Sequence, residues 1–109
     1  MLNFSIDLES LRNYKDPAKV SIFLSKNEIK SKKNIISLVG KIAAKKAFFK
    51  CIEDISADFK KIEIKNSRTG RPYIEILNDE LKKKLENKKI DISISHTKDI
   101  VVAICLIYE

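Results

Sequence analysis

The sequence has little of what disulfide, zinc or paired-histidine chemistry requires. It contains two cysteines, one histidine and no tryptophan. Cys51 falls in a helical pattern and Cys105 in an apolar run, and neither has the Cys/His spacing of a zinc site. We therefore expect both cysteines to be buried free thiols. The only imidazole, that of His96, has no second histidine with which to form a catalytic pair.

Long hydrophobic runs are also missing. No apolar segment approaches the roughly 20 residues that span a bilayer, and the N-terminus lacks the charged region and apolar stretch of a secretory signal. The 109 residues are 44% hydrophobic and 34% charged, which predicts one soluble globular domain, residues 1–109, without repeats or linkers. We expect a cytoplasmic protein that does not contact membranes.

Acidic residues are fewer than basic residues. The chain has 22 Lys and Arg against 15 Asp and Glu, a net charge of +7, which indicates an acidic partner. Nucleic acid, an acidic protein and a phosphorylated cofactor would each supply that charge. The nucleic-acid hypothesis is the weakest, because no zinc spacing or RNA-binding aromatic motif accompanies the lysines. A solvated lysine surface is the alternative to any partner.

Hydrophobic periodicity predicts an α+β fold in which an antiparallel sheet packs on one long central helix. Alternating apolar and polar residues predict strands, and apolar residues three and four apart predict helices. The expected strands are 2–7, 61–66, 71–77, 90–95 and 101–108, and the expected helices begin at Pro17, near Ser25, at Asn34 (continuing to residue 55) and after Asn78 (continuing to residue 88).

Local signals support several of these elements. Ser25 and Glu28 have the spacing of a capping box, which opens a helix. Gly40 lies inside the central helix, where glycine costs roughly 1 kcal/mol against alanine, so we expect a close packing contact there. Residues 66–70 have the composition of a hairpin loop.

Four motifs with chemical potential follow one another along the chain. Asp7 stands at the end of an apolar strand. Residues 43–50, Ala-Ala-Lys-Lys-Ala-Phe-Phe-Lys, place several ammonium groups on one helix. Gly-Arg-Pro, residues 70–72, closes the hairpin, and Ser-Ile-Ser-His-Thr, residues 93–97, ends a later strand. Ammonium groups suit phosphate, hydroxyls and an imidazole suit orientation, and a carboxylate suits a metal or a proton.

In this order the four motifs resemble the small holo-acyl-carrier-protein synthases, which are phosphopantetheinyl transferases, over essentially the whole chain. The resemblance implies transfer of the phosphopantetheine arm of coenzyme A to a serine of an acyl carrier protein, with magnesium as cofactor and adenosine 3′,5′-bisphosphate as the second product. It also implies a compact α+β domain, a homotrimer with active sites between subunits, and a role in fatty acid biosynthesis.

The resemblance also assigns roles to single residues. Asp7 matches the metal-binding aspartate, and Lys45 and Lys50 match lysines that face the phosphates. Lys46 and Lys50 are four residues apart and so share a helix face. The positions that match the turns contacting coenzyme A are Gly70, Arg71, Pro72, Ser95, His96 and Thr97.

Simpler interpretations stand beside these roles. Asp7 could cap a strand end, His96 could bond only the backbone, and Lys45 could run along the edge of the core. A basic surface for the carrier protein, or equally a solvated face, is offered by Arg12, Lys15 and Lys19. The expected oligomer contacts on the last strand are Ile104, Leu106 and Tyr108.

Three positions depart from the family pattern, and one of them bears on catalysis. Lys46 stands where the family has a glutamate that is the second metal ligand, Ser5 replaces a glycine and Lys41 an arginine. At about 4 Å and an effective dielectric near 20, an ammonium repels a divalent ion by roughly 8 kcal/mol. We therefore expect no ordinary magnesium site beside Lys46.

Two hypotheses follow from Lys46. In the first, its ammonium takes the place of the metal, pairs with Asp7 and the diphosphate, and acts with Lys50 in catalysis. In the second, the chain is a degenerate homologue that binds coenzyme A or an acidic carrier protein without transfer. If the chain does use magnesium, Glu9 or Glu53 must supply the second carboxylate.

Overall fold

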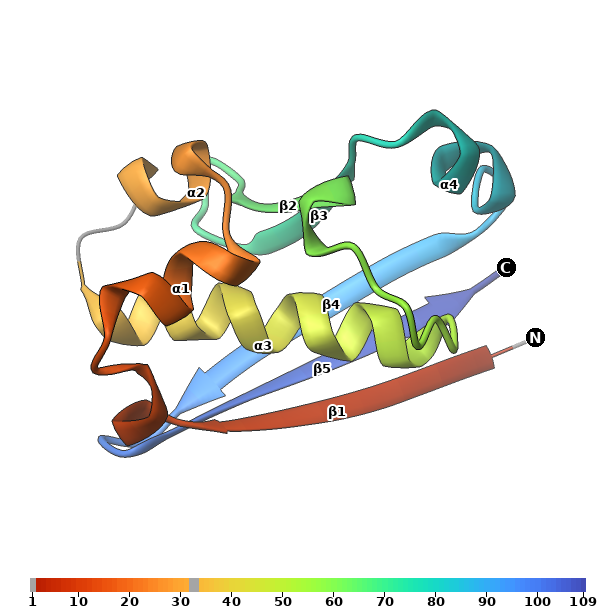
Figure 1. Ribbon diagram of the computed structural model, residues 1–109. Helices are drawn as coiled ribbons and strands as arrows, with labels where there is room; N and C mark the ends of the chain where they lie inside the picture. The colour runs from red at the N-terminus through yellow and green to blue at the C-terminus, as the bar shows by residue number, and fades with distance from the viewer. Residues whose placement is uncertain (1, 32–33) are drawn as a thin grey trace.

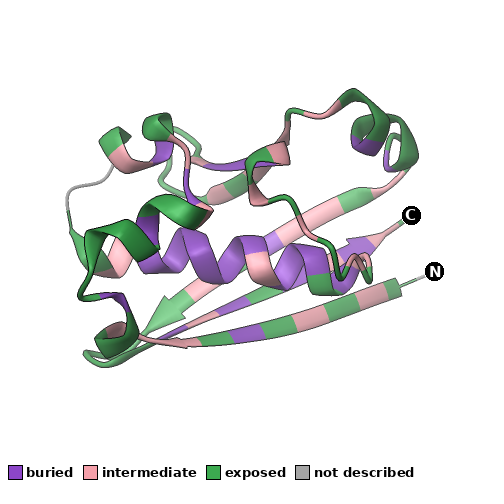
Figure 2. Cartoon of the chain, viewed as in Figure 1, coloured by how far each residue is buried: buried purple, intermediate pink, exposed green. Residues whose placement is uncertain are grey.

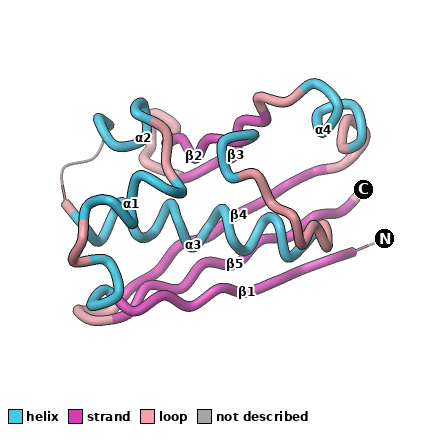
Figure 3. Tube along the Cα trace, viewed as in Figure 1, coloured by secondary structure: helices cyan, strands magenta, loops and turns pink. Residues whose placement is uncertain are grey.

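The longest helix, α3 (Ile35–Cys51), packs across one face of a three-stranded antiparallel sheet (Figures 1 and 3). The structure is a computed structural model that describes residues 2–31 and 34–109. The other elements in chain order are β1 (Leu2–Ser10), the 3-10 helix η1 (Leu11–Tyr14), α1 (Pro17–Phe23), α2 (Lys26–Ser31), the 3-10 helix η2 (Phe59–Lys61), β2 (Ile62–Asn66), β3 (Pro72–Ile76), α4 (Asp79–Lys84), β4 (Lys89–His96) and β5 (Ile100–Tyr108).

The strands form two sheets. The larger has the order β1-β5-β4, with both pairings antiparallel, and the smaller is the β2-β3 hairpin. The predicted α+β class is confirmed, and the expected sheet is divided into these two. β1 continues beyond Asp7 to Ser10 because its pairing with β5 continues to the Ser10–Ile100 pair.

The local signals have the expected geometry. The Ser25 amide donates to Glu28 Oε1 at 2.8 Å, and the Glu28 amide donates to Ser25 Oγ at 3.1 Å, which is the reciprocal pattern of a capping box. Pro17 is the first residue of α1, and Asp16 caps that helix by accepting from the Ala18 amide at 2.9 Å. The capping-box prediction is therefore confirmed.

The core lies between α3 and the three-stranded sheet, and Figure 2 shows α3 buried along most of its length. A Cβ atom added to Gly40 would lie 3.1 Å from Ile94 Cγ2 of β4, which confirms the close contact expected at this glycine. Cys51 and Cys105 are both buried and free, as predicted. α3 ends at Cys51, before the predicted residue 55, and Glu53 follows with a φ of +57°, outside helical geometry.

The opposite face of the sheet carries apolar side chains in solvent. Phe4 and Leu8 of β1 are each 66% exposed, and their β5 partners in register are Leu106 and Val102. Ile104 lies between these partners and is also exposed. Within the described residues, no helix is long and apolar enough to cross a membrane.

Candidate active site

The lysines of α3 form two pairs on different sides of the helix. Lys46 and Lys50 reach β1, whereas Lys41 and Lys45 reach the segment around α2 and β2. Each pair has the four-residue spacing that places side chains on one helix face. The shared face of Lys46 and Lys50 is as predicted.

A carboxylate–ammonium cluster, defined as Asp7, Glu9, Tyr14, Lys46 and Lys50, joins β1 and η1 to α3. Lys50 Nζ lies 2.8 Å from Asp7 Oδ1, and Lys46 Nζ lies 3.2 Å from Glu9 Oε1. The Tyr14 hydroxyl donates to the same Glu9 oxygen. The first of the two hypotheses for Lys46 includes a pairing with Asp7, and the structure corrects this detail, since Lys50 pairs with Asp7 and Lys46 pairs with Glu9.

The surroundings of the two carboxylates move their pKa values in opposite directions. Burial, together with the neighbouring Glu9, raises the pKa of Asp7 to about 6, and Lys50 opposes this shift. Burial also acts to raise the pKa of Glu9, but hydrogen bonds with Asp7, Tyr14 and Lys46 outweigh it and lower that pKa. Asp7 Oδ2 is buried without a hydrogen-bond partner, so this oxygen is the one free acceptor of the Asp7 carboxylate.

Lys45 does not face coenzyme A, contrary to prediction. Its side chain is fully buried, and its ammonium donates to Glu28 Oε1 at 2.6 Å and to the carbonyls of Phe23 and Phe59 at 2.9 Å. These three acceptors use all three hydrogens of the ammonium. Burial lowers the pKa of Lys45, and Glu28 opposes the shift. Lys45 therefore has a structural role.

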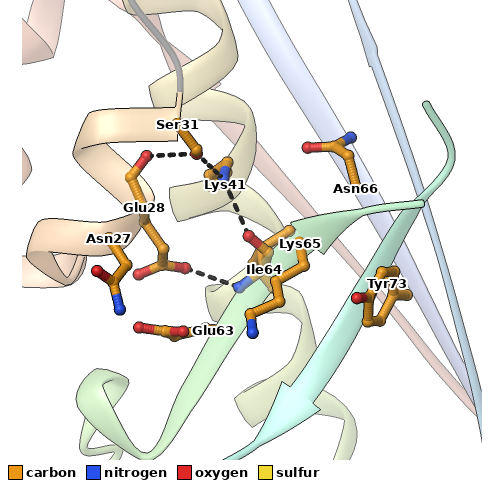
Figure 4. A pocket seen from close by; sticks show the side chains of 9 residues that line it. All are labelled: Asn27, Glu28, Ser31, Lys41, Glu63, Ile64, Lys65, Asn66 and Tyr73. Carbon is orange, nitrogen blue, oxygen red and sulfur yellow. Dashed lines mark hydrogen bonds between the residues drawn. The ribbon is translucent and has the colours of Figure 1, made fainter. Parts of the chain in front are cut away.

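Lys41 lies at a small polar cavity of about 330 Å³ between α2 and the hairpin (Figure 4). Its ammonium donates to Ser31 Oγ at 2.8 Å and to the Ile64 carbonyl at 3.0 Å. Glu28 Oε2 accepts from the Ile64 amide at 2.7 Å on the other side of the same residue. Lys41 therefore ties α3 to α2 and β2.

A second cavity, which we call the hairpin pocket, brings together part of the predicted coenzyme A site. It measures about 200 Å³, and Gly70, Pro72 and His96 line it together with Gly40 and Lys41 of α3. Gly70 has a φ of +88°, a conformation that glycine adopts without strain. This placement agrees with the predicted role of these residues but does not test it.

Three of the predicted turn residues, Arg71, Ser95 and Thr97, do not line the hairpin pocket. Arg71 is 71% exposed and lies 4.0 Å from Asp91. Ser95 pairs with Val102 on the outer face of the sheet. Thr97 Oγ1 accepts the Asp99 and Ile100 amides at 3.2 and 3.1 Å, which fixes the turn, and His96 Nδ1 lies 3.1 Å from the Thr97 carbonyl.

The cluster and the hairpin pocket are separate places on the chain, and we refer to them as the two half-sites of the predicted coenzyme A site. Lys46 and Lys50 line a groove of about 480 Å³ that also contains Glu53 and Asp54. Lys41 and Lys50 are nine residues apart on α3, which corresponds to about 13 Å along the helix axis. A ligand that needs both half-sites of a single chain would have to span that distance.

The residues at the cluster do not fit a magnesium ion. Two carboxylates suit magnesium, but Asp7 and Glu9 are each already paired with an ammonium, so the formal charge of the four groups sums to zero. In the described part of the chain, no three His, Cys, Asp or Glu side chains are placed to share a metal. The free oxygen Asp7 Oδ2 offers only one metal ligand, and it lies beside the ammonium groups of Lys46 and Lys50.

Sequence reasoning missed one member of the cluster and only partly anticipated another. Tyr14 gave no signal, because η1 is a short turn whose position depends on β1. Glu9 was considered only as a metal ligand. Its position two residues after Asp7 places both side chains on the same face of the strand. This spacing was the available signal that Glu9 would lie beside Asp7 in the cluster.

Comparison with known proteins shows what the chain is similar to in sequence and in fold. No family model matches the chain. The chain is 32% identical over 117 residues to a holo-[acyl-carrier-protein] synthase of Caldicellulosiruptor bescii, covering 97% of each protein. It is 31% identical over 94 residues to the Chlorobium chlorochromatii enzyme of the same name, covering 84% of this chain and 74% of that one.

A solved structure shows the same fold. The crystal structure of Helicobacter pylori holo-[acyl-carrier-protein] synthase in complex with coenzyme A superposes with a TM-score of 0.81 at 25% identity, covering 95% of this chain and 98% of that one. Fold and whole-length similarity together define a phosphopantetheinyl transferase. Within that class, the chain belongs to the holo-[acyl-carrier-protein] synthase family.

Proposed function

We propose that the chain transfers the phosphopantetheine arm of coenzyme A to a serine of an acyl carrier protein. The observation that carries this proposal is the whole-length similarity to proteins named holo-[acyl-carrier-protein] synthase. The net charge of +7 supports it, because both substrates are acidic under this proposal.

In the proposed reaction, the serine oxygen of the carrier forms a bond to the phosphorus next to the pantetheine arm. The bond from that phosphorus to the bridging oxygen breaks, and its electron pair stays with adenosine 3′,5′-bisphosphate. The serine proton passes to solvent in the overall balance. Cationic groups aimed at the diphosphate stabilise the charge that develops on the leaving group, and Lys46 and Lys50 have that chemistry.

We infer that coenzyme A binds between the cluster of one subunit and the hairpin pocket of the next. The family resemblance, which implies active sites between subunits, supports this arrangement. The exposed apolar face of the sheet supports a symmetric oligomer, and the family resemblance implies that it is a trimer. We include Phe4 in that interface, because it pairs with Leu106, one of the residues predicted to make the contact.

Mass spectrometry of an apo-acyl carrier protein incubated with coenzyme A tests the reaction. Active protein will add the mass of one phosphopantetheine to the carrier, and a carrier whose acceptor serine is replaced by alanine will gain nothing. A degenerate homologue would instead bind coenzyme A in calorimetry and leave the carrier mass unchanged. A chain that neither binds coenzyme A nor transfers would refute the proposal.

Light scattering tests the assembly. The unmodified chain is expected to be a trimer at micromolar concentration, and Phe4→Glu, which places a charge on the apolar face, is expected to shift it toward the monomer. Lys82→Glu, at an exposed position of α4, makes a larger change of charge outside this face and should leave the mass unchanged. A monomeric parent chain would refute the trimer.

A further inference from the structure

We propose that the ammonium groups of Lys46 and Lys50 bind the diphosphate of coenzyme A in this chain in place of a divalent ion, so that binding and transfer need no magnesium. This inference rests on the proposed function and concerns how its site handles charge. It follows from the disagreement between the cluster and a metal site.

Lys46 is held in place by three different contacts. Its Nζ atom lies 3.2 Å from Glu9 Oε1, 3.3 Å from the Tyr14 hydroxyl and 4.7 Å from the centroid of the Phe23 ring. A solvated lysine would have no such set of partners. The ammonium is therefore positioned before any ligand arrives, which reduces the cost of ordering it on binding.

Both ammonium groups also remain accessible. The Lys46 side chain is 27% exposed and that of Lys50 is 53% exposed, and both line the same groove of about 480 Å³. Lysine binds phosphate as a point charge that does not demand fixed coordination geometry. Each of these ammonium groups has two acceptors in the protein, so each keeps one hydrogen for a phosphate oxygen.

The same contacts act against the binding of a metal ion between Asp7 and Glu9. Glu9 Oε1 already accepts from Lys46 and Tyr14, and Asp7 Oδ1 accepts from Lys50. A divalent ion that used Asp7 Oδ1 and Glu9 Oε1 would have to displace both ammonium groups, and one that used the free Asp7 Oδ2 would lie beside them. Glu53 and Asp54, on the same groove, are the carboxylates that could offer an alternative site, and the experiment must distinguish this case.

Two measurements on the full chain test the proposal. The first is calorimetric titration of coenzyme A into the protein in chelator and in excess magnesium. The second is titration of Mn²⁺, as a paramagnetic substitute for magnesium, followed by electron paramagnetic resonance, with and without coenzyme A and against a coenzyme A blank. Thermal unfolding confirms that each variant is folded.

For the unmodified chain we expect the Kd for coenzyme A to differ by less than twofold between chelator and magnesium, and no Mn²⁺ site beyond the blank. Lys46→Met keeps the apolar stem and removes the charge, so it should weaken coenzyme A binding at least tenfold in both conditions. Lys46→Glu should create Mn²⁺ binding and magnesium-dependent affinity. Lys82→Glu, the exposed control, should change none of these.

A Mn²⁺ site in the unmodified chain, or coenzyme A binding that requires magnesium, would overturn the inference while leaving the proposed function intact. If Glu53→Gln then abolished that site, Glu53 would be the ligand. Unchanged affinity in folded Lys46→Met would also overturn it. Absence of coenzyme A binding in every condition would refute both the inference and the proposed function.

Discussion

At the scale of single residues, two lysines of this chain show how surroundings decide what an ion pair contributes. Lys45 and Glu28 are almost completely buried, and every hydrogen of the ammonium has an acceptor. Lys65 and Glu75 form a pair of similar length, 2.9 Å, on side chains that are 42% and 43% exposed. Losing one partner leaves a buried charge only in the first pair.

We predict that Lys45→Ala lowers the free energy of unfolding by about 3–5 kcal/mol. The matched change Lys65→Ala should lower it much less, because water screens that pair. Urea denaturation of both variants measures the difference. Equal losses in the two variants would show that Lys45 is not held as the structure indicates.

The pKa of Asp7 gives a second prediction at this scale. It is about 6 in the folded protein against an ordinary value of 3.8. Between pH 4 and 6 the folded state therefore binds more protons at Asp7 than the unfolded chain, so this residue makes the free energy of unfolding fall as pH rises through that window. Glu9, whose pKa is lowered, contributes with the opposite sign below its ordinary pKa.

Comparison with Asp7→Asn isolates the contribution of Asp7. We expect the variant to become more stable relative to the parent as pH rises from 4 to 7, measured by urea denaturation at several pH values. Asp99→Asn, an exposed carboxyl in the β4–β5 turn, should show no such trend. Parallel curves for Asp7→Asn and the parent would contradict the raised pKa.

At the scale of elements, periodicity predicted which segments form helices and strands but not the direction of every side chain. The four-residue spacing placed Lys46 and Lys50 on one face, and this is correct. It could not show that Lys45 points inward, because its partner Glu28 lies 17 residues earlier in the chain and only tertiary packing brings the two together. The capping box predicts where α2 begins, but it does not predict that Glu28 also binds Lys45.

The contact between α3 and β4 yields a prediction at Gly40. Alanine in a helix gains roughly 1 kcal/mol over glycine, but the new methyl would lie 3.1 Å from Ile94 Cγ2, and overpacking of this kind costs about 1–3 kcal/mol. We expect Gly40→Ala to be destabilising by about 1 kcal/mol in urea denaturation.

The same substitution in an Ile94→Ala background is the control. With the obstructing methyl removed, Gly40→Ala should become stabilising, since only the helix preference remains. A stabilising effect in both backgrounds would mean that β4 yields without cost.

At the scale of the whole molecule, hydrophobic periodicity was enough to predict the fold class, and four weak motifs in the right order were enough to predict the family. Their spatial relation was not predictable, because motifs adjacent in the family pattern line different cavities. Lys50 lines the groove at the end of α3, and Gly70, Pro72 and His96 line the hairpin pocket. Only the tertiary structure separates the two half-sites. The pairing of Lys46 with Glu9 in place of Asp7 was not predictable either, because it too depends on the tertiary structure.

This separation predicts complementation between defective subunits. Lys50→Glu disables the cluster and His96→Glu places a carboxylate in the hairpin pocket, so each variant alone should be inactive in carrier modification. In oligomers mixed equally from both variants, about a quarter of the interfaces will combine an intact cluster with an intact pocket. Activity should return to that fraction of the unmodified level.

Mixing Lys50→Glu with a second preparation of itself is the control and should restore nothing. Differently tagged subunits confirm that mixed oligomers have formed. Mixed oligomers without activity would place both half-sites of one reaction in the same subunit.

The carboxylate of Glu28 has a consequence for the order in which the fold opens. One oxygen accepts the Ser25 amide and Lys45, and the other accepts the Ile64 amide, so one side chain holds the start of α2, the middle of α3 and the hairpin strand β2. Neither amide can exchange its hydrogen for deuterium until its hydrogen bond to the Glu28 carboxylate breaks. Ser25 and Ile64, 39 residues apart, should therefore exchange through a common opening event.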